Sequence, residues 1–409
     1  MQKRILIILC LLGCLMYGYG QTWKQFEKEA KRAFEKEAYG EVLYYLDTLQ
    51  KIDSAKFDLH FLQARAAQFY NAFELAEKNY EKVLAGTKTE LYPPATLGLA
   101  TVQKMQGKYQ AAIDGFGDYL TLDTDTSSIN HQDASAQIEA CKWAMELIKV
   151  NDKDLEINQL STDINTDYSD FAPFPYEGKL LFSSLRFVPQ GKKADKSKKY
   201  SKVLQLAKGS SNPEIYDLGT GGEELHTAHA TFNRDGDRMY FNICEYTEGN
   251  IIECKIYVRQ KLQDSLWGRP EILPIWVNRQ NDNVSQPNVG YDEKTGREML
   301  FFTSARVGGK GGRDIWMAYL DEGGDPLQPI NLKAVNTTGN EFSPFFHDYT
   351  QTLYFSSDGR KSLGGYDIYK SALIDGEYQD VIHTGFPLNS SYNDVYFSLN
   401  HIGSDGFLV

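Results

Sequence analysis

The stretch Asn336–Tyr369 reads NTTGNEFSPFFHDYTQTLYFSSDGRKSLGGYDIY and decides the fold of more than half of the chain. A run of β-branched and aromatic residues, Thr352–Ser356, is followed by the turn residues Ser357–Arg360 and the glycine pair Gly364-Gly365. A second run, Tyr366–Tyr369, then begins. This order predicts a strand, a loop and a returning strand. Because the same order recurs upstream, the chain contains an internal repeat.

The repeats align on a dipeptide that precedes the first strand of each unit, and its first residue stands at positions 172, 230, 286, 343 and 396. A central strand with an apolar start and a polar end follows in the first four units. The central strands are Leu181–Ser184, Met239–Asn242, Leu300–Ser304 and Leu353–Ser357. An asparagine precedes most units, at Asn165, Asn278, Asn336 and Asn389. Units of this size with about four short strands cannot bury their faces alone, so we expect them to stack radially as blades of a β-propeller.

Charged residues recur at fixed places in these units. An arginine follows the central strand in three of them, and an aspartate opens the last strand in two. These residues are Arg186, Arg306, Arg360, Asp314 and Asp367. The stretches FSSDGRKSLGGYDIY and FTSARVGGKGGRDIW resemble the WD40-like repeats of TolB-type propellers in Gram-negative envelope proteins. The arginine and the aspartate are interpreted as a structural pair that holds the loop against the last strand, with ligand contact as the alternative.

The resemblance implies six blades, of which four complete units and one partial unit are visible. The fifth unit reaches Gly406–Val409, where the pattern calls for another strand. We therefore expect that the chain continues past Val409 or that another segment completes the blade. In the resembling family a helical repeat array and such a propeller commonly continue into a carboxypeptidase-regulatory-like domain and an OmpA-like peptidoglycan-binding domain.

Residues 22–150 have apolar side chains at helical spacings of three and four. A small–aromatic–small pattern recurs with a period of 34 and then 36 residues. Its members are Ala30, Tyr39, Val42 and Leu46, then Ala64, Phe73, Ala76 and Tyr80, then Ala100, Tyr109, Ala112 and Phe116. This pattern, clearest in Gly107–Ala112, resembles the tetratricopeptide repeat. The segment Ala134–Lys149 is expected to be the closing helix.

The tetratricopeptide resemblance implies a concave surface that holds a peptide or a partner protein. Its candidate residues are His60, Gln63 and Gln68, although the array can also serve only as a spacer. The loop that contains Asp123, Asp125 and Ser127 lacks the glycine and the closing glutamate of an EF-hand, so we interpret it as a solvated loop.

Residues 1–20 have the parts of an export signal: the basic Lys3 and Arg4, an apolar run over Ile5–Tyr17, and small residues before Gln21. Cleavage after Gly20 would give a secreted protein. The alternative is a lipoprotein acylated on Cys14, because Leu11-Leu12-Gly13-Cys14 resembles a lipobox.

Beyond this signal three cysteines remain. Cys244 and Cys254 flank a turn, so they could oxidise across a hairpin or stay as two buried thiols, whereas Cys141 is unpaired. The chain has 55 acidic and 43 basic residues and a net charge of −12, which argues against a nucleic-acid partner.

Catalytic motifs are absent from the sequence: it has neither the Gly-x-Ser-x-Gly nor the His-Glu-x-x-His pattern. His226 and His229 lack accompanying metal ligands, and we interpret them as strand or loop histidines. Gly308–Gly312 is interpreted as a flexible hairpin loop rather than a phosphate loop. A lysine cluster is interpreted as a solvated loop, with contact to anionic cell-wall or lipid groups as the alternative. Its members are Lys192, Lys193, Lys196, Lys198 and Lys199.

The sequence thus predicts an α + β multidomain protein: a signal peptide (1–20), a tetratricopeptide-like helical solenoid (22–150) and a mostly antiparallel TolB-like β-propeller (155–409). We expect no catalytic, cofactor or metal site. The expected function is a periplasmic, outer-membrane-associated scaffold that binds envelope proteins, reaches peptidoglycan through a further C-terminal domain and serves a secretion machine. The alternative is a propeller that senses a small glycan or peptide.

Overall fold

The computed structural model describes residues 23–50, 56–86, 92–150, 155–189, 199–221, 224–247, 252–263 and 266–409. The chain divides into two compact units, with the boundary between Glu146 and Leu147. The first unit is helical and the second is built of antiparallel sheets, which confirms the predicted fold class. In the part of the chain described here, no helix combines the length and the apolar character that crossing a membrane requires.

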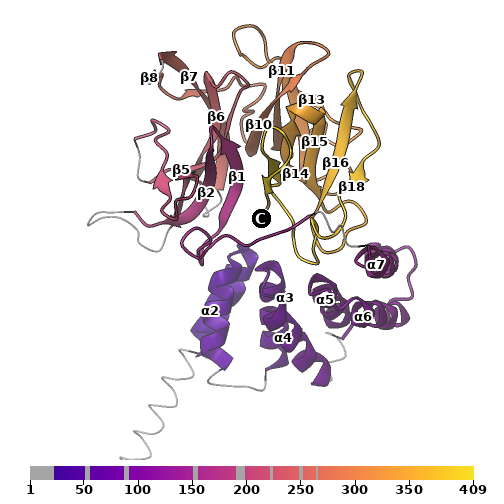
Figure 1. The fold of residues 1–409 in the computed structure, drawn as a ribbon. Helices are drawn as coiled ribbons and strands as arrows, with labels where there is room; N and C mark the ends of the chain where they lie inside the picture. The colour runs from indigo at the N-terminus through magenta and orange to yellow at the C-terminus, as the bar shows by residue number, and fades with distance from the viewer. Residues whose placement is uncertain are drawn as a thin grey trace, which may run out of the picture. The chain divides into compact units, whose positions relative to one another are not determined.

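The helical unit consists of antiparallel helix pairs (Figure 1). A first helix over residues 23–35 precedes α2. The other helices are α2 (Tyr39–Gln50), α3 (Phe57–Phe69), α4 (Phe73–Ala85), α5 (Tyr92–Met105), α6 (Tyr109–Leu122) and α7 (Ile129–Leu147). Each of the three predicted repeats therefore corresponds to one helix pair, and α7 is the predicted closing helix.

Small residues at the helix contacts explain the repeat pattern. Ala64, Ala76, Ala100 and Ala112 are fully buried, so neighbouring helices approach closely. The approach is also close at Gly98, where an added Cβ would lie 2.3 Å from Cζ of Tyr80. The aromatic positions of the pattern fill the remaining space between the helices, and the periodicity in the sequence is thus a packing periodicity.

The described residues of the second unit form four blade sheets, in which the first four strands are hydrogen-bonded in sequence order, and one smaller sheet. Blade 1 contains β1 (Asp170–Tyr176), β2 (Lys179–Phe187), β3 (Tyr200–Ala207) and β4 (Glu214–Ile215). Blade 2 contains β5 (His226–Phe232), β6 (Arg238–Tyr246), β7 (Ile252–Gln263), β8 (Leu266–Trp267) and β9 (Glu271–Ile272). Blade 3 contains β10 (Val284–Asp292), β11 (Arg297–Ser304), β12 (Asp314–Tyr319) and β13 (Ile330–Asn331). Blade 4 contains β14 (Glu341–His347), β15 (Thr352–Ser357), β16 (Asp367–Ile374), β17 (Glu377–Tyr378) and β18 (Ile382–His383).

A fifth, two-stranded sheet of β19 (Ser398–Leu399) and β20 (Gly406–Phe407) follows blade 4. It contacts β1, and the C-terminus lies between β1 and β14 in Figure 1. The described residues therefore hold four complete blades and one partial unit, as counted in the sequence. The six blades implied by the resemblance are not found in this part of the chain.

The first strand of each blade has an irregular step, which lies at the aligned dipeptide in blades 1, 3 and 4 and one residue before it, at His229, in blade 2. The register of all four blade sheets shifts there, and the residue at the step has a left-handed backbone. The five residues are Ala172 (φ 53°), His229 (φ 56°), Gln286 (φ 58°), Ser343 (φ 49°) and Tyr396 (φ 58°). A bulge of this kind bends the strand and redirects its side chain. The four bulges and the left-handed Tyr396 of the fifth unit line one narrow cavity at the propeller axis.

Polar side chains from the preceding unit hold these bulges. The His229 N–H donates to Ser183 Oγ (3.0 Å), and the Gln286 N–H donates to Asn242 Oδ1 (2.9 Å). The Ser343 N–H donates to Gln286 Oε1 at 2.8 Å. The polar end of the central strand joins blade 1 to blade 2 and blade 2 to blade 3, whereas the bulge residue Gln286, which itself accepts from Thr303 Oγ1 at 3.1 Å, joins blade 3 to blade 4. Each bond gives a partner to a backbone N–H that would be costly to bury without one.

The recurring asparagines join blades in a second way. Asn278, Asn336 and Asn389 each accept from the N–H and donate to the carbonyl of an isoleucine in the third strand of the preceding blade. Their side chains therefore act like a residue of a paired strand. The equivalent Asn165 instead donates to the Leu160 carbonyl, since no complete blade precedes it.

Candidate functional site

In blades 1, 3 and 4 the repeated arginine fastens the start of the blade to its second strand. Arg186 donates to Asp170 (2.7 Å), and Arg360 donates to Glu341 (3.2 Å). Both guanidinium groups also donate to the carbonyl of the residue before the recurring asparagine. Arg306 likewise donates to the carbonyl of Val277, and its Nε lies 3.9 Å from Oδ2 of Asp282.

The repeated aspartates hold the glycine-rich turns. Asp367 accepts from the Leu363 N–H at 2.7 Å and lies 2.7 Å from Nε2 of His383. Asp314 accepts from backbone N–H groups of the glycine loop and from Asn331. The predicted arginine–aspartate pair is therefore wrong. The arginine reaches an acid on the first strand, while the aspartate faces the turn before its own strand.

A cavity of about 720 Å³ lies beside the start of blades 1 and 2. Its wall includes residues of β1 and β5, the ends of β6 and β7, and Tyr396 next to the fifth unit. The wall is mainly apolar, and the carboxylate of Asp170 in it is engaged by Arg186. A concave, largely apolar site with a few polar groups is typical of ligand binding.

His226 is held in this cavity by a hydrogen bond and by two aromatic rings. Its Nδ1 accepts from the Ser201 N–H at 3.1 Å, so the hydrogen of the neutral ring is on Nε2. The ring lies between Tyr200 and Tyr246, with centroids 4.9 and 5.0 Å away. Burial, assisted by the charge of Lys202, lowers the pKa of His226 to about 4. Within the described residues, its Nε2 is buried and has no hydrogen-bond partner.

His229 joins the cavity to the propeller axis. Its Nε2 lies 3.2 Å from the hydroxyl of Tyr396, which also accepts from Gln286 Nε2 at 3.0 Å. Burial lowers the pKa of His229 to about 4, so this ring is also neutral at pH 7. The two histidines thus have separate partners and do not converge on one point. No cluster of three or more His, Cys, Asp or Glu suited to a metal ion occurs in the described ranges.

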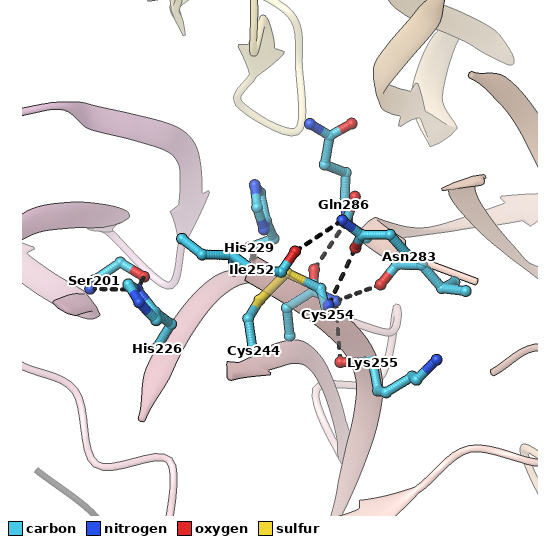
Figure 2. The surroundings of a disulfide bond; sticks show 12 residues. Ser201, His226, His229, Cys244, Ile252, Cys254, Lys255, Asn283 and Gln286 are labelled. Atoms are coloured by element: carbon cyan, nitrogen blue, oxygen red, sulfur yellow. Dashed lines mark hydrogen bonds between the residues drawn. A yellow bond between two sulfur atoms is a disulfide. The ribbon is translucent and has the colours of Figure 1, made fainter. Parts of the chain in front are cut away.

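A disulfide between Cys244 and Cys254 forms part of the cavity wall (Figure 2). The two residues are directly opposite each other on β6 and β7, with Cα atoms 4.0 Å apart. Asn283 accepts from the Cys254 N–H at 3.1 Å. The cross-link closes a hairpin of sequence separation 10 at the rim of the cavity. Cys141 is a buried free thiol of α7, and burial raises its pKa to about 11.

The predicted concave-face residues of the helical unit lie elsewhere. His60 and Gln63 are buried, and His60 Nδ1 lies 3.0 Å from Asn79 Oδ1. Gln68 accepts from the Tyr80 hydroxyl at 2.6 Å. His60 and Gln68 therefore join α3 to α4, and the burial of His60 and Gln63 contradicts their assignment to a binding surface. Polar side chains at helical spacing gave no sign of this inward direction.

Other predicted features have local structural roles. The loop with Asp123 is closed by internal hydrogen bonds, including Ser128 Oγ to Asp123 Oδ2 (2.6 Å). The glycine loop Gly308–Gly312 is a hairpin connection held by Asp314. Lys199 lies over the ring of Tyr168, 3.5 Å from its centroid. Cys14, the export signal and the other four lysines of the cluster lie outside the described residues.

No motif in the sequence indicated Ser201 or Tyr396 as cavity residues. Tyr396 was visible only as the residue aligned with the other bulges, and its side chain could not be placed without the ring. Ser201 comes from an unremarkable strand start and reaches the site because β3 lies against β5.

No protein-family model and no curated protein sequence matches this chain. Among solved structures, the tetratricopeptide domain of OM64 from Arabidopsis is 15% identical, with a TM-score of 0.26, and covers 29% of this chain and 95% of its own. The Yersinia enterocolitica type III secretion chaperone SycD, in complex with a peptide of the translocator YopD, is 16% identical (TM-score 0.27; 31% and 95% covered). An α-L-arabinofuranosidase from Clostridium thermocellum is 14% identical (TM-score 0.37; 58% and 80% covered). Similarity at this level assigns no function.

Proposed function

We propose that this chain is an exported, non-enzymatic adaptor of the cell envelope that binds a protein partner through its helical repeats and a second partner through its propeller. The observation that carries the proposal is the use of the repeated polar side chains. The arginines, aspartates, asparagines and central-strand polar residues are engaged in bonds within and between blades. A scaffold built this rigidly suits a binding platform.

The helical unit offers an exposed aromatic surface for a protein partner. Phe69 and Tyr70 at the end of α3 are 50% and 59% exposed. Phe69 stacks on Tyr39, with ring centroids 5.0 Å apart, so the aromatic surface extends across two helix pairs. Exposed aromatic groups of this kind are enriched at protein interfaces. The resemblance to tetratricopeptide repeats supports the same role.

The proposed location is the periplasm, at the outer membrane, with a link to peptidoglycan or to a secretion machine of the type IX kind. It rests on the export-signal pattern of residues 1–20 and on the resemblance to OmpA-associated TolB-type propellers. Secretion and acylation of Cys14 remain the two alternatives for the mature N-terminus. Mass spectrometry of the mature protein distinguishes a free Gln21 from an acylated Cys14.

The adaptor proposal is tested by affinity capture from envelope fractions with the intact protein and with a variant carrying Phe69→Ser and Tyr70→Ser. We expect specific envelope proteins to be captured by the intact protein and lost from the double variant. Ile129→Ser is the matched control, because Ile129 is 84% exposed on α7, outside this surface. Recovery of no specific protein or peptidoglycan would contradict the proposal.

The cavity favours a second candidate function, in which the propeller binds a small glycan or peptide. The unpartnered Nε2–H of His226 would donate to a ligand oxygen. The largely apolar wall, in which the Asp170 carboxylate is already paired with Arg186, suits an uncharged ligand. A thermal-shift screen of glycans and muropeptides should then give a saturable rise in the melting temperature. Ile252→Trp, at the cavity wall, should abolish the rise, whereas Ile272→Trp on β9 should not.

A further inference from the structure

Three units share an acidic residue two positions before the bulge. Asp170, Glu341 and Asp394 occupy this place in blade 1, in blade 4 and in the fifth unit. Each carboxylate accepts from the backbone N–H and the hydroxyl of a Thr or Ser four positions earlier. These residues are Thr166, Thr337 and Ser390. The three local structures therefore match.

The three sites differ in their positive partner. Asp170 has Arg186 and Glu341 has Arg360, with N–O distances of 2.7 and 3.2 Å. Asp394 is only 5% exposed, and within the described part of the chain no arginine or lysine forms an ion pair with it. A buried carboxylate without a countercharge is costly, and the two equivalent carboxylates each have one.

The titration behaviour of the two sites agrees with this difference. Burial raises the pKa of Asp394 to about 7, and the nearby Asp367 carboxylate adds to the effect. Burial also acts on Asp170, but hydrogen bonds from Ser184 and Arg186 outweigh it and lower the pKa of Asp170. Asp170 thus gains hydrogen bonds from Ser184 and Arg186 that favour its charged form, and the Ser390 hydrogen bonds do not outweigh burial at Asp394.

The strand register gives the place from which a guanidinium would come. In the fifth unit, Val395 and Val409 exchange two backbone hydrogen bonds, of 2.7 and 2.9 Å. The equivalent pairs are Phe171 with Ser183 and Phe342 with Ser356. Arg186 lies three positions after Ser183, and Arg360 lies four positions after Ser356.

We propose that Asp394 is an arginine receptor, and that its ligand is a guanidinium three or four positions beyond Val409, on a polypeptide segment in line with β20. Such an arginine would donate to the Asp394 carboxylate. It would also donate to the Leu388 carbonyl, the equivalent of the Ile164 and Val335 carbonyls that receive Arg186 and Arg360. It would fasten the fifth unit as the other arginines fasten blades 1 and 4.

The test appends Ser-Asp-Gly-Arg, the sequence of residues 357–360, directly after Val409 of the full chain. The control appends Ser-Asp-Gly-Gln, and both extensions are also made with Asp394→Asn. We expect the arginine extension to raise the melting temperature of the propeller above that of the glutamine extension, and the difference to disappear with Asp394→Asn. Equal melting temperatures would overturn the proposal, and so would a difference that persists with Asp394→Asn.

A second measurement keeps the proposal testable if an extension prevents folding. The carboxyl carbon of Asp394 is followed by NMR through a pH titration of the unextended chain. We expect a midpoint near neutral pH that falls in the arginine-extended chain. A midpoint already at the value of an ordinary aspartate in the unextended chain would show that no cation is missing.

Discussion

Replacement of Arg360 by methionine tests the fastening role of the repeated arginines. The change removes hydrogen bonds to Glu341 (3.2 Å), to Ser357 Oγ (3.3 Å) and to the Val335 carbonyl (2.6 Å). It leaves the fully buried Glu341 without its positive partner. Methionine keeps most of the apolar contact of the arginine stem with Phe355 and Tyr369.

The magnitude follows from the burial of the pair. Removing one partner of a buried ion pair typically costs about 3–5 kcal/mol. Glu341 retains hydrogen bonds from Thr337 and Ser357, and the Arg360 side chain is 19% exposed. We therefore expect the lower end of that range, about 3 kcal/mol. Adding Glu341→Gln to Arg360→Met should cost less than the sum of the two single changes, because the two residues act as a unit.

The assay is urea unfolding followed by hydrogen-exchange mass spectrometry, which reports blade 4 and the helical unit separately. We expect peptides of blade 4 to lose protection at lower urea and peptides of α3 and α4 to be unchanged. Arg234→Met is the matched control, since Arg234 pairs with Glu293 at the surface and both side chains are about half exposed. The fastening role is refuted if Arg360→Met behaves like this control, or if the costs of the two single changes add.

Three further predictions concern the disulfide, the blade contacts and the cavity. Replacing Cys244 and Cys254 by serine should lower the free energy of unfolding of the propeller by about 2.5 kcal/mol, from the chain-entropy cost of the 10-residue separation, and urea denaturation with and without a reductant measures it. Asn242→Ala leaves the buried Gln286 N–H without its acceptor and should cost about 1–3 kcal/mol in the same assay, with Asn242→Asp as the variant that keeps an acceptor. Burial lowers the pKa of His226 to about 4 in the folded protein, so on acidification the unfolded chain binds a proton at a higher pH than the folded chain does. The free energy of unfolding should therefore fall by up to about 3 kcal/mol between about pH 6.5 and 4. His226→Gln should remove this part of the pH dependence.

The fold could be predicted because its periodicities are packing requirements. A blade needs apolar strands at a fixed spacing, and a helix pair needs small residues where helices meet, so both requirements are visible in the order of residues. The direction in which a side chain points is not visible in the order of residues. Arg360 and Asp367 stand seven positions apart and suggested a pair, but they belong to different hydrogen-bond networks.

Side-chain direction also explains why some predicted site residues were wrong and why others were missed. His60 was expected on a surface because it is polar, yet it packs inward on Asn79. The cavity is assembled from segments as distant as Ser201 and Tyr396, which come together only when the ring forms. A local sequence pattern does not predict contacts between such distant residues, because these contacts depend on how whole blades pack against one another.

The repeats also separate structural residues from candidate functional ones. Side chains that recur at equivalent positions, such as the asparagine at 278, 336 and 389, make the same bonds in each blade, and a partner could engage one only by breaking the propeller. The five bulge positions, in contrast, share a backbone conformation but carry Ala, His, Gln, Ser and Tyr. The backbone requirement is met without any particular side chain, so these residues are free to differ. Specificity for a ligand at the axis should therefore depend on His229, Gln286 and Tyr396, whose side chains are joined in one chain of hydrogen bonds.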